Sequence, residues 1–187
     1  MKVLLDANLL YPTVLREILM GTAKSGLFTP LWSPRILDEW ARAAARLGPD
    51  GAAIAQGEIA RLGANWPAAS IRPRPRDLTR LWLPDPDDVH VLAAAIAGSA
   101  DLILTLNARD FPRHILADEG IARADPDHFL LGLWQASPGP VGQAVANVHA
   151  EACRLSGQAL DLRKLLKRAR LPRLGKAMTG QSVSRQP

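Results

Sequence analysis

The chain has 187 residues, of which 48% are hydrophobic and 22% are charged, as in one ordinary soluble domain with a short appendage. This composition excludes disordered and fibrous proteins. Stretches such as Leu92–Ile96 are far shorter than the ~20 apolar residues of a membrane helix, so no membrane insertion is expected. A single cysteine, Cys153, excludes an internal disulfide, and no Cys or His cluster indicates a zinc site. Nothing at the N-terminus is typical of a secretion signal, so a cytoplasmic protein is expected.

The charges are unevenly distributed along the chain. Residues 1–135 contain 14 Lys and Arg against 16 Asp and Glu, whereas residues 136–187 contain 9 against 2. The net charge of +5 therefore comes from the C-terminal part. We expect a body over residues 1–135 and a basic helical extension over residues 136–187, with a disordered end from residue 180. Such an extension is typical of contact with nucleic acid, an acidic protein or an anionic surface, and a tail that only improves solubility is the alternative.

Short apolar strands alternate with helical patterns along the first 135 residues. Strands are predicted over residues 2–5, 101–105 and 121–124, and helices after Pro12, from Ser33-Pro34, over residues 49–65 and from Asp85 to Gly98. Pro126 and an apolar run over residues 129–134 follow the third strand. Residues 71–77 contain two prolines and predict an exposed, non-helical connector. After a break at residues 137–140, two further helices are predicted over residues 141–155 and 160–169. This alternation favours an α/β fold with a mainly parallel sheet, which places its site at the carboxyl ends of the strands.

Oxygen-bearing side chains recur at the predicted strand ends and helix starts. Asp6 follows the first strand, Glu39 lies early in the second helix, and both also fit simple roles, as a helix cap and as a charge at the helix dipole. Capping accounts for Asp85 at the next helix start, but Asp87 and Asp88 add repulsion that a nearby cation would relieve.

Two more such side chains, Asn107 and Asp110, follow the second strand, where turn formation is their ordinary role. A parallel sheet would bring these distant positions together. Oxygen ligands alone suit Mg²⁺ or Mn²⁺, and such ions commonly act on phosphate substrates. The expected reaction is phosphodiester hydrolysis, in which the cation activates a water and offsets negative charge at phosphorus.

In order and spacing, these motifs resemble the PIN-domain family, in particular the VapC-type ribonuclease toxins of bacterial toxin–antitoxin pairs. The resemblance covers residues 1–133 and rests on Val-Leu-Leu-Asp-Ala-Asn at residues 3–8, Ser-Pro-Arg-Ile-Leu-Asp-Glu at 33–39, Asp-Asp-Val-His-Val-Leu-Ala-Ala-Ala at 87–95 and Asp-Leu-Ile-Leu-Thr-Leu-Asn-Ala-Arg-Asp-Phe at 101–111. It implies a three-layer α/β/α nuclease domain. It also implies that Asp6, Glu39 and Asp88 are the catalytic, metal-ligating acids and that Asn8 orients Asp6.

The fourth acidic position departs from the family pattern, because Asn107 stands where many relatives have Asp. Either Asn107 ligates the ion through its amide oxygen or a water, or Asp110 takes part. Asp87 would partly replace the missing charge, and Thr105 is expected to contact a water on the ion or a phosphate. Fewer charges predict weaker metal binding, which leaves open a non-catalytic PIN-fold binding module.

The basic extension contains a helix with one apolar face and one cationic face. Its apolar residues are Leu160, Leu162, Leu165, Leu166 and Ala169, and its cations are Arg163, Lys164, Lys167, Arg168 and Arg170. Three interpretations stay open: the cations bind RNA phosphates, the apolar stripe docks an antitoxin, or the helix only packs on the body. Core packing is expected for the five tryptophans, and a structural role for His90 and His114.

The preferred hypothesis is a Mg²⁺- or Mn²⁺-dependent endoribonuclease, the toxin of a type II toxin–antitoxin pair. Its partners would be an RNA substrate and a cognate antitoxin, and the resemblance also implies a homodimer. The alternatives are a PIN nuclease that processes RNA or cuts DNA, and the non-catalytic module. An aspartyl-phosphate phosphatase is disfavoured, because no lysine occurs between Lys24 and Lys164 to pair with a phosphoryl group.

Overall fold

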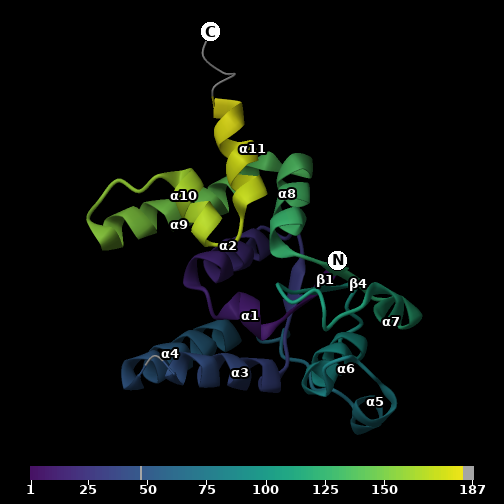
Figure 1. Cartoon of the computed structure of the whole chain (residues 1–187). Coiled ribbons are helices and arrows are strands. Elements are labelled where there is room, and N and C mark those ends of the chain that lie inside the picture. The colour runs from purple at the N-terminus through teal and green to yellow at the C-terminus, as the bar shows by residue number, and fades with distance from the viewer. Residues whose placement is uncertain (47, 183–187) are drawn as a thin grey trace. The chain divides into compact units, whose positions relative to one another are not determined.

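The computed structural model describes residues 1–46 and 48–182, which form two compact units (Figure 1). Unit 1 comprises residues 1–11 and 28–124, and unit 2 comprises residues 12–27 and the part of the chain from residue 125 onward. The expected boundary at residue 135 falls inside unit 2, because a compact unit follows packing rather than chain order. The division into a nuclease domain over 1–135 and an extension over 136–187 remains a prediction about function.

Unit 1 is built on a sheet of four parallel strands, β1 (Lys2–Leu5), β2 (Thr29–Leu31), β3 (Leu102–Leu104) and β4 (Ala122–Ala124), in the order β2-β1-β3-β4. In the central strand, Leu4 pairs with Leu31 on one side and with Ile103 on the other. Val3, Leu4, Leu5, Ile103 and Leu104 are fully buried, as strands covered on both faces require. The sheet confirms the α/β class and the parallel arrangement.

Strand β2 was not predicted from the sequence. It is only three residues long and contains Pro30, which has no N–H to donate and normally weighs against a strand. Its pairing with β1 stabilises it, and the neighbouring Trp32 extends the edge through an isolated parallel bridge to Ser70. Tertiary pairing therefore overrides the local preference here.

Unit 1 also contains α1 (Ala7–Leu10), α3 (Pro34–Ala45), α4 (Pro49–Asn65), α5 (Pro75–Arg80), the 3-10 helix η1 (Pro86–Asp88), α6 (Val89–Ala97) and α7 (Arg113–Asp118). Helix α6 packs on β1 and β3, and α3 packs beside α4 (Figure 1). Ser33 caps α3 as predicted: its hydroxyl accepts the N–H of Ile36 at 3.2 Å. This cap fixes the start of α3, the helix that carries Glu39.

The segment 71–77 is not entirely the exposed connector that its prolines predict. Helix α5 begins at Pro75, the first helical position, where the missing N–H of proline costs no hydrogen bond. Asp77 is buried, and its Oδ1 accepts from Nε of Arg80 at 3.1 Å. Arg80 also binds both carboxylate oxygens of Glu119, at 2.6 and 2.8 Å. The expectation was wrong for residues 75–77, because these ion pairs supply the stability that the local sequence lacks.

The described part of unit 2 is helical. It contains α2 (Thr13–Lys24), α8 (Pro126–Ala136), α9 (Pro138–Ser156), α10 (Leu162–Arg168) and α11 (Pro172–Ser182). Helices α2 and α9 pack closely, since a Cβ added to Gly21 would lie 3.1 Å from Cβ of Ala144. None of the described helices in either unit has the length and apolar character needed to cross a membrane.

Two expectations for unit 2 are corrected. The proposed break at residues 137–140 is the start of α9, which tolerates Pro138 and Pro140 because both lie in its first turn. Residues 180–182, expected to be disordered, belong to α11. The rest of that expected disordered end, residues 183–187, lies outside the described residues.

Candidate metal centre

The chain order of the strands creates a switch point between β1 and β3. From β1 the chain first forms β2 on one side of β1 and later β3 on the other side. Ligand sites of parallel sheets lie at such a switch point, beyond the carboxyl ends of the strands. Asp6 directly follows β1 and Thr105 directly follows β3, and the N–H of Asp6 donates to the carbonyl of Leu104 at 3.2 Å. The sheet thus places both polar side chains at this switch point.

Asp6 is held by hydrogen bonds that do not serve helix capping. It occupies the N-cap position of α1, yet its side chain makes no capping bond. Its Oδ2 instead accepts from the Thr105 hydroxyl at 2.6 Å and from Nδ2 of Asn8 at 2.5 Å. Burial raises the pKa of Asp6 and the charge of Glu39 adds to this rise, while the bonds from Thr105 and Asn8 oppose it. The carboxylate is therefore oriented by its neighbours, as a ligand would be.

Thr105 orients Asp6 and is itself saturated. Its side chain lies in the interior, with 1% of the residue exposed. While it donates to Asp6, its oxygen accepts from Nδ2 of Asn8 at 3.1 Å and from the N–H of Asn107 at 2.9 Å. A hydroxyl has one donor and two acceptor sites, so no capacity is left for the expected contact with a phosphate or a water on the ion. Asn8 completes the group by accepting the N–H of Leu106 at 3.1 Å.

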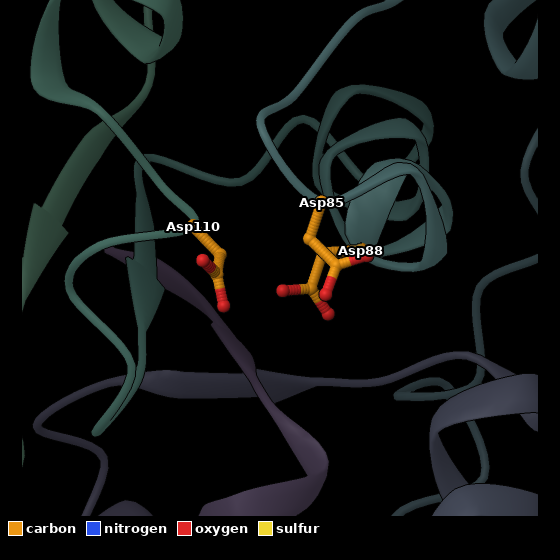
Figure 2. A group of neighbouring side chains, drawn as sticks. All are labelled: Asp85, Asp88 and Asp110. Carbon is orange, nitrogen blue, oxygen red and sulfur yellow. The ribbon is translucent and has the colours of Figure 1, made fainter.

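Three carboxylates converge beside this pair. Asp85, Asp88 and Asp110 each offer one oxygen, and these oxygens lie within 4.8 Å of one another. Figure 2 shows Asp85 and Asp88 at the start of the α6 region and Asp110 facing them from the loop after β3. Oδ1 of Asp85 also accepts the N–H of Asp87 at 2.9 Å, so Asp85 caps η1 as predicted. A residue that the sequence explained as a cap is thus also part of the acidic cluster.

The cluster leaves negative charge uncompensated. Burial and the negative charges of its acidic neighbours, of which Asp6 has the largest effect, raise the pKa of Asp88 from 3.8 to about 7. The other contributing acids are Asp85, Asp110 and Glu39. These five carboxyl groups therefore share one electrostatic environment. Asp88 therefore takes up a proton as the pH falls below about 7, and a divalent cation bound by these oxygens would displace that proton.

Glu39 differs from the other acids because it has cationic and polar neighbours. Its Oε1 lies 2.8 Å from Nε2 of His90 and 3.4 Å from Nε of Arg35. Burial raises the pKa of Glu39, but His90 and Arg35 outweigh this effect and the net pKa lies below its ordinary value. A second nitrogen of Arg35 lies 3.3 Å from the carbonyl of Asp87, which links α3 to η1. The lowered pKa favours the ionised form of Glu39, which is the form that binds a cation.

Of the other predicted side chains, Asn107 contacts the acidic cluster and Asp87 does not. Asn107 donates its amide N–H to Oδ2 of Asp110, so it supports a member of the cluster. Asp87 does not join the cluster: its side chain is 93% exposed and lies 3.7 Å from Arg35. The expected compensation by Asp87 is therefore not supported by its position.

Sequence reasoning missed Asp85 as a cluster member and His90 as a neighbour of Glu39. The signal for Asp85 was the acid count, because capping needs only one of the three acids at residues 85–88. For His90 no signal existed, since its partner lies 51 residues earlier in the chain.

Comparison with known proteins identifies the architecture. A family model described as PIN domain matches residues 2–109, more than half of the chain. No curated protein and no solved structure matches the chain. PIN domains are generally nucleases that use divalent metal ions, and the carboxylates assembled at the end of the parallel sheet suit such an ion. On the match and the fold, the chain belongs to the PIN-domain family.

Proposed function

We propose that this protein is an endoribonuclease that requires Mg²⁺ or Mn²⁺ and acts as the toxin of a type II toxin–antitoxin pair. The observation that carries the proposal is the convergence of Asp85, Asp88 and Asp110, whose oxygens lie within 4.8 Å, in the field of Asp6 and Glu39. A PIN nuclease needs such a set of oxygen donors, and oxygen-only donors favour Mg²⁺ or Mn²⁺ over zinc.

In this proposal, Asp6, Glu39 and Asp88 are the catalytic acids and Asp110 fills the fourth position. A divalent ion bound here would supply positive charge against the phosphate oxygens and promote deprotonation of the attacking water. Asn8 and Thr105 hold Asp6, and Asn107 holds Asp110 through its amide. In the absence of the ion, burial and the charges of its acidic neighbours raise the pKa of Asp88 to about 7. The shortage of charge inferred from Asn107 is offset by Asp85.

RNA is the proposed substrate, and the cations of α10 are its proposed second contact. Arg163, Lys164, Lys167, Arg168 and Arg170 are all exposed, and among the described residues none of them has an ion-pair partner. Unpaired exposed cations suit the phosphates of a nucleic acid. On this basis α10 contributes to affinity and not to the reaction itself.

The proposed antitoxin is not expected to dock on the apolar stripe of α10. Leu166 and Ala169 are buried, and α10 packs against α11. A Cβ added to Gly175 of α11 would lie 3.2 Å from Cβ of Leu166, so the two helices are in close contact. Much of the stripe is thus used inside unit 2. A cytoplasmic location and a homodimer remain parts of the proposal, as expected for the resembled toxins.

Growth of a bacterial host after induced expression tests the toxin role. The wild-type protein should arrest growth and fragment cellular RNA, while Asp88→Asn should do neither. Purified protein with MnCl₂ should cut a single-stranded RNA and lose activity in EDTA. Cleavage of the DNA of the same sequence at an equal rate would point to the DNA alternative. No cleavage of either polymer with Mg²⁺ or Mn²⁺ would favour the non-catalytic module.

A further inference from the structure

His90 lies in the first turn of α6, two residues after Asp88, and its side chain is 2% exposed. Its Nε2 is 2.8 Å from Oε1 of Glu39, which belongs to α3. The contact therefore joins two helices that carry acids of the candidate metal centre. Its length is that of a strong polar contact, and the imidazole is shielded from water while the Glu39 side chain is 27% exposed.

A buried histidine is normally satisfied by hydrogen bonds within the core. Neither ring nitrogen of His90 makes a hydrogen bond of ordinary angle to any residue that the structure describes. Within the described part of the chain, the carboxylate of Glu39 lies beside the ring, 2.8 Å from Nε2. A role in core packing alone does not explain why an imidazole, and not an apolar side chain, occupies this place.

Electrostatics indicates what the contact does. The charge of Glu39 acts unfavourably on Asp6 and on Asp88, so an unrestrained carboxylate would gain by turning away from them. Two arginines also lie near Oε1 of Glu39, but they are more distant and more exposed: Arg35 at 3.4 Å is 51% exposed, and Arg42 at 3.9 Å is 68% exposed. Water screens such an exposed pair, whereas the contact with His90 is protected.

We propose that His90 is a positioning residue that holds the carboxylate of Glu39 within the metal centre, against the repulsion of Asp6 and Asp88. The role requires an N–H at Nε2, which lies 2.8 Å from Oε1 of Glu39 as a close polar contact without the alignment of a regular hydrogen bond. The effect of His90 on metal binding rests on the proposed function, whereas its position beside Glu39 is observed in the structure.

Three substitutions separate positioning from packing. His90→Gln places an amide N–H near the position of Nε2, whereas His90→Phe fills the volume without a donor. Calorimetric titration of each protein with MnCl₂ at one fixed pH measures metal affinity directly. Removal of a side chain that orients a metal ligand costs roughly 10–100-fold in affinity. We expect that loss in His90→Phe and in Glu39→Gln, and recovery to within about threefold of the wild type in His90→Gln.

A metal-free measurement tests the contact itself. In ¹⁵N-resolved NMR spectra, the Nε2 signal of His90 should shift in Glu39→Gln and stay in place in Asp38→Asn. Asp38 is the matched control, because it is the adjacent acid of α3 and is exposed. This experiment does not depend on the folding of the His90 variants.

The outcomes distinguish the two proposals. A wild-type protein that binds no Mn²⁺ contradicts the proposed function. Wild-type Mn²⁺ binding that is unchanged in His90→Phe, or a His90→Gln variant no better than His90→Phe, overturns only the role of His90. An Nε2 signal that does not shift in Glu39→Gln overturns the role of His90 as well.

Discussion

The protein contains two clusters of like charge, and water screens the repulsion within them to different extents. In the acidic centre of unit 1, carboxylates from several elements lie close together and partly buried, and this burial together with their repulsion raises the pKa of Asp88 to about 7. On α10 of unit 2, four cations follow the period of a single helix and a fifth, Arg170, lies in the following turn, all exposed to water. Water screens the second cluster far better than the first.

The difference shows which cluster is built for a specific ligand. The acids are held individually: Asp6 by Thr105 and Asn8, Asp110 by Asn107, and Glu39 by His90. Such fixed neighbours suit an ion with strict geometric demands. Within residues 1–46 and 48–182, the cations of α10 have no such side-chain partners, and they suit a flexible polyanion. Substitutions in the acidic centre should therefore have large and specific effects, and substitutions on α10 small and salt-dependent ones.

The largest effect is expected from Asp88→Asn. The substitution removes a central carboxylate of the cluster, and loss of the metal's several kcal/mol of transition-state stabilisation corresponds to about 100-fold or more in rate. Cleavage of a fluorescent RNA in Mn²⁺ measures it. Asp87→Asn is the matched control, since Asp87 is adjacent and 93% exposed, and should keep nearly full activity. Equal losses in both variants would contradict the assignment.

Thr105→Val should have the next largest effect. The substitution keeps the shape of a side chain of which 1% is exposed, but removes the hydroxyl that donates to Asp6 at 2.6 Å and accepts from Asn8 and Asn107. Loss of an orienting partner predicts a decrease of about 10–100-fold in Mn²⁺ affinity. Calorimetric titration checks this, and an unchanged affinity would show that Asp6 needs no support from Thr105.

A pH dependence of stability is expected in the metal-free protein. The pKa of Asp88 is raised in the folded state, so between its ordinary value of 3.8 and about 7 the folded protein binds more protons than the unfolded chain. The contribution of Asp88 to the free energy of unfolding therefore falls as the pH rises through this window. Melting temperatures in EDTA should decline from pH 5 to pH 8, less steeply in Asp88→Asn. Saturating MnCl₂ should raise the melting temperature most at pH 8.

The sequence allowed the main features of unit 1 to be predicted because its signals are local. An apolar run that ends at Asp6 indicates a buried strand, and Ser33-Pro34 indicates a helix start that the structure confirms. Strand β2 was missed because it depends on pairing with β1. The same limit applies to the site: acids near Asp6 and Asp88 follow from strand ends and helix starts, whereas the contact of His90 with Glu39 depends on how α3 and α6 come together.

Unit 2 shows the same limit in its helices. The amphipathic pattern predicts α10, whose N-cap Asp161 accepts the N–H of Lys164 at 2.7 Å. Helix α11 begins at Pro172, but the residue before it, Leu171, has no side-chain acceptor that could cap the helix. Its start is fixed by the buried Asp127 of α8, which accepts the N–H groups of Arg173 and Leu174 at 2.8 and 2.9 Å. A cap supplied from 46 residues away cannot be read from the local sequence.

Lys164→Gln/Lys167→Gln should change salt dependence more than affinity at high salt. Both lysines are exposed, and each lost phosphate contact lowers the slope of log affinity against log salt by about 0.7 for a single strand. Binding of a single-stranded RNA to the Asp88→Asn background, measured by anisotropy at several KCl concentrations, should show a slope shallower by about 1.4. Arg72→Gln/Arg74→Gln removes two exposed cations of unit 1 as the control. Equal changes in both pairs would show that only net charge matters.

The smallest effect, and the one that separates binding from stability, is expected from Arg170→Gly. Arg170 has a positive φ of 64°, in the turn where the N–H of Leu171 donates to the carbonyl of Leu166 at 2.8 Å. Glycine is the residue favoured at this position after a helix, and a side chain there costs about 1 kcal/mol. The variant should therefore unfold at a higher denaturant concentration while binding RNA a few-fold more weakly at low salt. If the variant is more stable and its RNA affinity is unchanged, Arg170 does not contribute to RNA binding. If the variant gains stability but binds RNA more weakly, Arg170 contributes to RNA binding even though its backbone conformation at this turn is unfavourable.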